Sequence, residues 1–164
     1  MNLLETKKAK GVPLKRLYRS HKNFGLRATE ELRRAKRYSE FLSLILLDLK
    51  SLNGLVKNYK NPKKFFHDLE KFIRISVRET DIVSGLEDQR LALLLFETPK
   101  DGAFCLAKRL NQEIKYFVKN SINGPKSKTS QNLKIKTKII SFPEEDSGEK
   151  QFLNFVRNNF ICQQ

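Results

Sequence analysis

The sequence predicts an α/β (α+β) fold with a ferredoxin-like βαββαβ core, in which an antiparallel-containing sheet is flanked by helices. Apolar runs of strand length alternate with stretches of helical period in that order along the chain. The first and third predicted strands are apolar throughout, as expected of the two central strands of such a sheet. The fourth alternates with lysine, which commonly protects a sheet edge from pairing with other chains.

The first 25 residues are predicted to form a basic, irregular arm, followed by one domain at residues 26–164. Pro13 and Gly25 interrupt any helical period within the arm. Residues 28–38 favour a helix instead, because their acidic side chains come early and their basic side chains come late. That order complements the helix dipole.

The first strand is expected at residues 42–49, a nearly unbroken apolar run with Asp48 near its end. A short helix is expected at 51–59. The next helix begins at Asn61-Pro62, where asparagine is the N-cap and proline takes the first helical position. Its apolar side chains keep a helical period to about Arg78.

A β-hairpin is predicted after this helix. Ile82 and Val83 lead into Ser84-Gly85, a polar turn follows, and residues 91–96 then form an apolar run. Because that run has no polar alternation, we expect its strand to be buried on both faces.

The remainder of the chain is predicted to be a helix, a loop, a strand and a last helix. Residues 98–101 read as a capping box at the start of the first of these helices. A polar loop is expected at 120–132, the lysine-alternating strand at 133–139, and the last helix at 151–160.

Composition restricts the class of protein. A chain of 164 residues is long enough for one domain with a proper core. It has no apolar run near the ~20 residues that a membrane span needs, and no signal-peptide pattern at its start. Its two cysteines make neither a metal spacing nor a disulfide framework, so we expect a cytoplasmic protein.

The net charge of +15 is high for this length, and much of it lies in residues 1–37. Such a charge attracts nucleic acid, anionic lipid, acidic protein surfaces or phosphorylated ligands, and does not choose among them. A solvated basic tail without a dedicated partner accounts for it equally well.

The hairpin and the residues before it resemble the signature hairpin of GGDEF domains, the diguanylate cyclases of bacterial cyclic di-GMP signalling. Residues 78–81, Arg-Glu-Thr-Asp, match the Arg-x-x-Asp pair that precedes that hairpin. The resemblance extends over about residues 30–158: 46–48 are similar to the end of the family's first strand, 102–110 to the helix after the hairpin, and 140–146 to the last strand. It implies a core of the GGDEF/nucleotidyl cyclase type.

The resemblance also implies that catalysis is lost. Asp48 matches the family's metal-holding aspartate on the first strand, but the acidic pair of the turn falls on Gln89 and Arg90. The family's guanine-contacting Asn and Asp fall on Val56 and Phe65. An arginine among the ligands would repel magnesium, and valine and phenylalanine cannot hydrogen-bond a base. We therefore expect no enzyme activity, no bound metal and no cofactor.

A second alignment places Gly85-Leu86-Glu87-Asp88 on the Gly-Gly-Asp-Glu turn and brings Glu87 near Asp48. It needs compensating insertions and deletions on both sides, and it leaves Val56 and Phe65 unchanged. Asp48, Glu87 and Asp88 are then remnants of a metal site that would hold metal or nucleotide weakly.

Arg78 and Asp81 match the family's inhibitory site, where the Arg-x-x-Asp pair binds cyclic di-GMP. A guanidinium group contacts phosphate or a guanine edge bidentately, and a carboxylate accepts from guanine N–H groups. The family often adds an arginine from the next helix, and Arg109 lies at about that offset. The alternative is an ordinary surface ion pair between Arg78 and Asp81, which is worth ~0–1 kcal/mol.

Other reactive side chains carry less information. His21 and His67 have no cysteine or carboxylate partners at metal spacing, and Cys105 is expected in the core. The aromatic residues fall mostly at core positions, which weakens any predicted stacking surface for nucleic acid.

These observations predict a catalytically inactive GGDEF-like regulatory module. It would bind cyclic di-GMP at Arg78, Asp81 and Arg109, dock an unidentified partner protein, or do both. The competing hypothesis is a protein that binds nucleic acid or another anionic surface through the basic residues 1–37.

Overall fold

The computed structural model describes residues 21–57, 59–85, 89–123, 133–144 and 148–161. Its elements are α2 (His21–Tyr38), β1 (Leu42–Asp48), η1 (Lys50–Leu52), α3 (Asn53–Val56), α4 (Pro62–Ser76), β2 (Ile82–Gly85), β3 (Arg90–Phe96), α5 (Lys100–Val118), η2 (Lys119–Asn123), β4 (Lys136–Phe142), α6 (Glu149–Val156) and η5 (Arg157–Ile161). The predicted βαββαβ order is confirmed. Residues 1–20 of the predicted arm lie outside the described residues.

The four strands form one sheet in the order β2-β3-β1-β4, and every neighbouring pair is antiparallel. The two fully apolar strands, β1 and β3, are therefore central, as their composition predicted. The lysine-alternating strand, β4, lies at an edge with Lys136 and Lys138 exposed. It begins three residues later than expected, because it pairs with β1 along its whole length, from Phe142 opposite Leu42 to Lys136 opposite Asp48.

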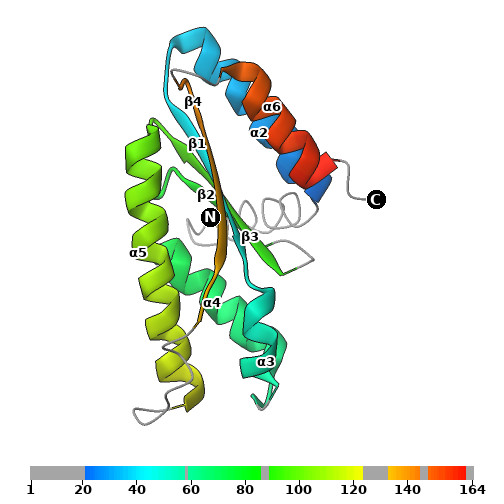
Figure 1. Ribbon diagram of the computed structural model, residues 1–164, viewed down its shortest axis with the longest axis vertical. Coiled ribbons are helices and arrows are strands. Elements are labelled where there is room, and N and C mark those ends of the chain that lie inside the picture. Colours follow the sequence, from blue (N-terminus) through cyan, green and yellow to red (C-terminus); the bar gives the residue numbers. More distant parts are fainter. Residues whose placement is uncertain (1–20, 58, 86–88, 124–132, 145–147, 162–164) are drawn as a thin grey trace, which may run out of the picture.

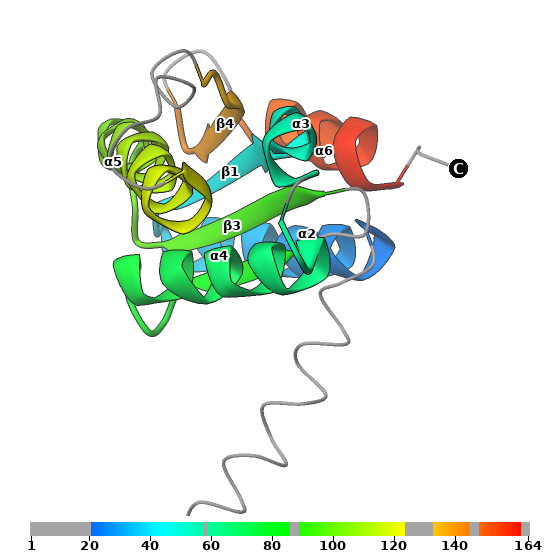
Figure 2. The same ribbon diagram turned by 90° about the horizontal axis from the view of Figure 1, so that it is seen from below.

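Helices cover both faces of the sheet (Figure 1). Alternate residues of β1 point to opposite sides, so Ile45 and Leu47 pack against α4 and α5 while Leu44 and Leu46 pack against α2 and α6. Seen from below, α5 and α6 lie on opposite sides of the strands (Figure 2). Within the described residues, no helix combines the length and the apolar character that crossing a membrane requires.

Helix α4 begins as the sequence predicted. The Asn61 side chain accepts a hydrogen bond from the backbone N–H of Lys64 at 3.2 Å, and Pro62 takes the first helical position. The buried face of the helix carries Phe65, Leu69 and Ile73, each of which contributes about 1.5–3 kcal/mol by leaving water. The helix ends at Ser76, two residues earlier than expected, because the next residue is in an extended conformation.

Helix α5 does not begin with the capping box that the sequence predicted. Its N-cap is Pro99, and no side chain caps the first turn. The Thr98 hydroxyl instead donates to the carbonyl of Phe96 at 2.8 Å and accepts from the guanidinium of Arg78. The Thr98 hydroxyl, which the local pattern assigned to the helix N-terminus, therefore binds Arg78 and the Phe96 carbonyl instead.

The predicted arm is wrong for residues 21–25, because α2 begins at His21. Phe24 is fully buried, with its ring centroid 4.9 Å from that of Phe160 in η5. A Cβ atom on Gly25 would come within 2.9 Å of the Cβ of Phe160. Glycine allows α2 to approach the C-terminal segment here, and this packing outweighs its helix-propensity cost of about 1 kcal/mol.

Replacing Gly25 with alanine is expected to lower the free energy of unfolding by about 1–3 kcal/mol, because the new methyl group overlaps Phe160. Urea denaturation measures the change. Gly54→Ala is the control, since a Cβ at Gly54 meets no atom within 4 Å, and we expect it to be neutral or stabilising. Equal effects of the two substitutions would contradict close packing of α2 on the C-terminal segment.

Candidate functional site

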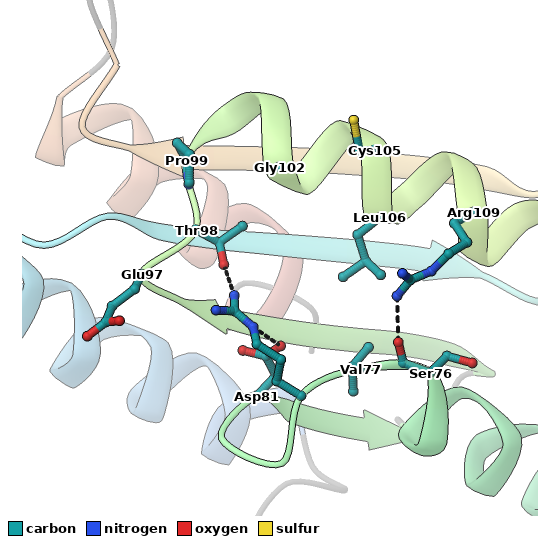
Figure 3. Close-up of a pocket in the computed structure, with 11 residues that line it drawn as sticks. Ser76, Val77, Asp81, Glu97, Thr98, Pro99, Gly102, Cys105, Leu106 and Arg109 are labelled. Carbon is teal, nitrogen blue, oxygen red and sulfur yellow. Dashed lines mark hydrogen bonds and ion pairs between the residues drawn. The ribbon is translucent and has the colours of Figure 1, made fainter.

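Arg78, Asp81 and Arg109 lie at one cleft, which has a volume of ≈ 730 Å³. The turn between α4 and β2 supplies the first two residues, and α5 supplies the third. Figure 3 shows the cleft between this turn, the segment that follows β3, and the first turns of α5. The other lining residues are Ser76, Val77, Glu97, Thr98, Pro99, Gly102, Cys105 and Leu106.

The Arg78 guanidinium is held from one side by acceptors of the protein. Its Nε lies 3.4 Å from Oδ2 of Asp81, and one terminal nitrogen donates to the Phe96 carbonyl at 3.0 Å and to the Thr98 hydroxyl. The side chain nevertheless remains 57% exposed. The group is therefore oriented in advance while part of it still faces solvent at the cleft.

The Asp81 carboxylate is buried, with only 2% of the side chain exposed. Its Oδ1 accepts the backbone N–H of Phe96 at 3.3 Å, and its Oδ2 accepts from Arg78. The backbone N–H of Asp81 also donates to the Arg78 carbonyl at 3.0 Å, which closes the turn. This pair therefore differs from the ordinary surface ion pair that the sequence left open, because its carboxylate joins the turn to the end of β3.

Arg109 reaches across the cleft from α5 (Figure 3). One of its terminal nitrogens donates to the Ser76 carbonyl at 2.5 Å, and its Nε lies 3.7 Å from Oε1 of Glu113. The Ser76 carbonyl is one of the last carbonyls of α4, which have no partner within their own helix. Arg109 thus ties two helices together and leaves 55% of its side chain exposed beside the cleft.

A buried hydroxyl pair connects this cleft to the centre of the sheet. The Ser43 hydroxyl, on β1, donates to the Thr98 carbonyl at 2.6 Å and lies 2.7 Å from the Ser141 hydroxyl on β4. Since Ser43 has one proton, Ser141 is the donor between them. Sequence reasoning did not bring Ser43, Ser141 and Thr98 together, because two serines in strands and a threonine assigned to a helix cap carry no signal of being neighbours.

Cys105 is exposed and lines the cleft, so the expectation that it belongs to the core is wrong. The buried positions of α5 are spaced by three or four residues: Ala103, Ala107, Leu110, Ile114 and Val118. With about 3.6 residues per turn, Cys105 falls on the side of α5 opposite these positions.

The residues matched to the cyclase's metal site lie at the other end of β1. Asp48 stands opposite Arg90 of β3 and Lys136 of β4, and its Oδ1 accepts the backbone N–H of Lys50 at 3.0 Å. Arg90 is 6% exposed; it donates to the Asn159 carbonyl at 2.8 Å. Its guanidinium also lies 5.7 Å from the centre of a phenylalanine ring in η5. The described strands therefore place two cationic residues opposite Asp48.

Glu87 and Asp88, the remaining members of the predicted metal remnant, lie outside the described residues. Over the ranges that the structure describes, no group of three or more histidine, cysteine, aspartate or glutamate residues could hold a metal ion. His67 is exposed on α4. Val56 and Phe65, which replace the guanine-contacting residues of the resemblance, are buried in the core between the sheet and α4.

Comparison with solved structures identifies the fold. The chain is similar to the active GGEEF domain of a diguanylate cyclase from Vibrio cholerae, at 17% identity and a TM-score of 0.54 over 78% of this chain and 79% of that one. It is similar to a DGC protein from Thermotoga maritima, at 22% identity and a TM-score of 0.56 over 90% of this chain and 98% of that one. A third likeness is to diguanylate cyclase SiaD from Pseudomonas aeruginosa, solved in complex with its activator SiaC. There the identity is 13% and the TM-score 0.57, over 96% of this chain and 62% of that one.

No family model matches the sequence, and no curated protein does. These three structural likenesses, each below 25% identity, show the fold alone. The chain has the fold of GGDEF domains, as the resemblance of its hairpin predicted.

Asp81→Ala is expected to lower the free energy of unfolding by about 1–3 kcal/mol, because it leaves the part-buried N–H of Phe96 without this acceptor and releases Arg78. A surface ion pair would lose less than about 1 kcal/mol. Urea denaturation distinguishes the two, with Glu79→Ala as the exposed control in the same turn. A loss no larger than that of the control would contradict the buried position of the Asp81 carboxylate.

Proposed function

We propose that this chain is a catalytically inactive regulatory module with the GGDEF fold, and that it binds cyclic di-GMP in the cleft between Arg78 and Arg109. The observation that carries the proposal is the convergence of these two half-exposed guanidinium groups, 31 residues apart in sequence, at one cleft. Its volume of ≈ 730 Å³ falls within the range of about 300–1,000 Å³ that small-molecule sites occupy.

The chemistry of the ligand matches this arrangement. Cyclic di-GMP carries two phosphates and two guanines, and arginine forms paired hydrogen bonds with either group. Arg78 is already oriented by its internal acceptors, so less conformational entropy is lost when it binds. In this proposal Asp81 acts through Arg78, because both of its carboxylate oxygens are already engaged within the protein.

The proposed loss of catalysis is supported by the surroundings of Asp48. Two-metal nucleotidyl transfer requires clustered carboxylates. Here the cross-strand neighbours of Asp48 are Arg90 and Lys136, and both are cationic. Positive charge at these positions opposes the binding of magnesium.

A module of this kind would act through another protein. One structural neighbour, the Pseudomonas aeruginosa cyclase SiaD, was solved in complex with its activator. We propose by analogy that the present chain also docks a partner protein, whose identity is open.

Incubation of the pure protein with GTP and magnesium or manganese is expected to yield no cyclic di-GMP by chromatography, because the described cross-strand neighbours of Asp48 are cations, not carboxylates. An active diguanylate cyclase in parallel shows that the assay works. Clear product formation that Asp48→Ala abolishes would contradict the proposed inactivity and favour the shifted alignment with Glu87 and Asp88 in the turn.

Calorimetry with cyclic di-GMP is expected to show binding that Arg78→Ala and Arg109→Ala each weaken roughly tenfold to a hundredfold. A charge-assisted hydrogen bond contributes about 1.5–3 kcal/mol, and each 1.4 kcal/mol is a factor of ten. Asp48→Ala is the control and should leave the affinity unchanged, since it lies at the other end of β1. Wild-type affinity in Arg78→Ala together with lost binding in Asp48→Ala would show that the cleft is not the site.

A further inference from the structure

The cleft between Arg78 and Arg109 continues into two further hollows on the surface. The second hollow, of ≈ 360 Å³, has Arg78 and Glu97 in common with the cleft and extends to Arg27 and Arg34 of α2. A third hollow, of ≈ 550 Å³, shares Arg34 with the second and continues along α2. Neighbouring hollows share lining residues and therefore adjoin one another, and the run of three is here named the arginine groove. Its arginines are Arg109, Arg78, Arg27, Arg34, Arg33 and Arg37.

The arginine groove has an excess of positive charge, which is concentrated along α2, whereas the cleft itself has two arginines and two carboxylates. Arginines outnumber carboxylates among its lining residues; the carboxylates are Asp81, Glu97, Glu40 and Glu30. Glu31, which is buried, lies 2.9 Å from Arg27 and 3.9 Å from Arg34 and holds both on one face of α2. The third hollow has the largest excess, with three arginines and one glutamate.

An exposed aromatic ring lies at the far end of the arginine groove. Tyr38 lines the third hollow and is 60% exposed, and Phe41, three residues further along the chain, is 46% exposed. The sequence placed most aromatic residues in the core, and these two depart from that expectation. The Tyr38 ring beside the arginines of the third hollow suits single-stranded nucleic acid, because a base can stack on the ring while guanidinium groups contact the phosphates.

We propose that the arginine groove binds single-stranded nucleic acid, with phosphates along the arginines and a base stacked on Tyr38. A chain of hollows suits an extended, flexible polyanion, whereas a planar lipid surface would touch only the rim. Arginine pairs with phosphate bidentately and also stacks on bases, which lysine does not do. Since Arg78 belongs to both sites, a strand in the groove and cyclic di-GMP in the cleft exclude one another. The nucleic-acid site itself does not depend on binding of the dinucleotide.

The test uses the double variant Arg33→Ala/Arg37→Ala in the full chain. Both side chains are exposed and lie outside the cyclic di-GMP cleft. The control is Lys64→Ala/Lys71→Ala, which removes the same charge from exposed positions of α4. Fluorescence anisotropy with labelled oligouridine and oligothymidine of about 16 nucleotides is measured over a range of salt concentrations. Thermal unfolding of all variants confirms that they are folded.

We expect Arg33→Ala/Arg37→Ala to weaken binding at least roughly tenfold and to reduce the salt slope by about 1.4, since each phosphate contact on a single strand contributes about 0.7. Tyr38→Ala should weaken binding without changing the slope, because stacking releases no counterions. The lysine control should change the affinity less than about twofold, because exposed charges beyond a Debye length are screened. Added cyclic di-GMP should displace the strand from the wild-type protein.

Three outcomes would overturn the proposal: no binding to either oligonucleotide, equal losses in the arginine and lysine variants, or binding to phosphatidylserine vesicles alone that the arginine substitutions weaken. Calorimetry separates this inference from the dinucleotide site. Arg33→Ala/Arg37→Ala should bind cyclic di-GMP as the wild type does, while Arg78→Ala weakens both ligands. Bound oligonucleotide without any calorimetric signal for cyclic di-GMP would retire the proposed function and leave the groove in place.

Discussion

Strand β1 pairs along both edges and buries side chains on both faces, and the rest of the structure depends on that double burial. Ile45 and Leu47 pack in one core, and the even-numbered residues from Leu42 to Leu46 pack in the other. A one-residue slip in pairing would exchange the two faces, so the register with β3 and β4 is strongly specified. The same register places Ser43 beneath the cleft and Asp48 at the opposite end of the sheet.

At the cleft, a buried carboxylate fixes an exposed cation. The Asp81 carboxylate is removed from solvent and accepts hydrogen bonds from the N–H of Phe96 and the guanidinium of Arg78. Without these two donors, its desolvation would be costly. The outcome is a guanidinium whose orientation is set by the backbone of β3. A ligand anion arriving there meets a group that is already in position, while a freely rotating arginine would have to be ordered on binding.

At the other end of β1, an arginine has become part of the packing. Arg90 is nearly buried, donates to the carbonyl of Asn159 and lies over the ring of Phe160. Phe160 in turn packs on Phe24 and leaves room only for glycine at position 25. The C-terminal segment, the hairpin and the first described helix are therefore joined at the end of the sheet where the cyclase resemblance locates its metal site. Under the proposed function, this end of the sheet has a structural packing role in place of a catalytic one.

Local patterns determined most of the fold. Two continuously apolar runs identified the central strands β1 and β3, and Asn61-Pro62 predicted the start of α4, because hydrophobic periodicity and capping act between residues close in sequence. The chain alone also indicated Arg78 and Arg109 as members of one site, through the resemblance. Tertiary structure alone decided the helical state of Gly25, the burial of Asp81 and the use of Thr98 as a partner of Arg78. Each of these depends on a contact with a residue that is distant in sequence. A pattern within a short window of sequence does not identify that contact partner.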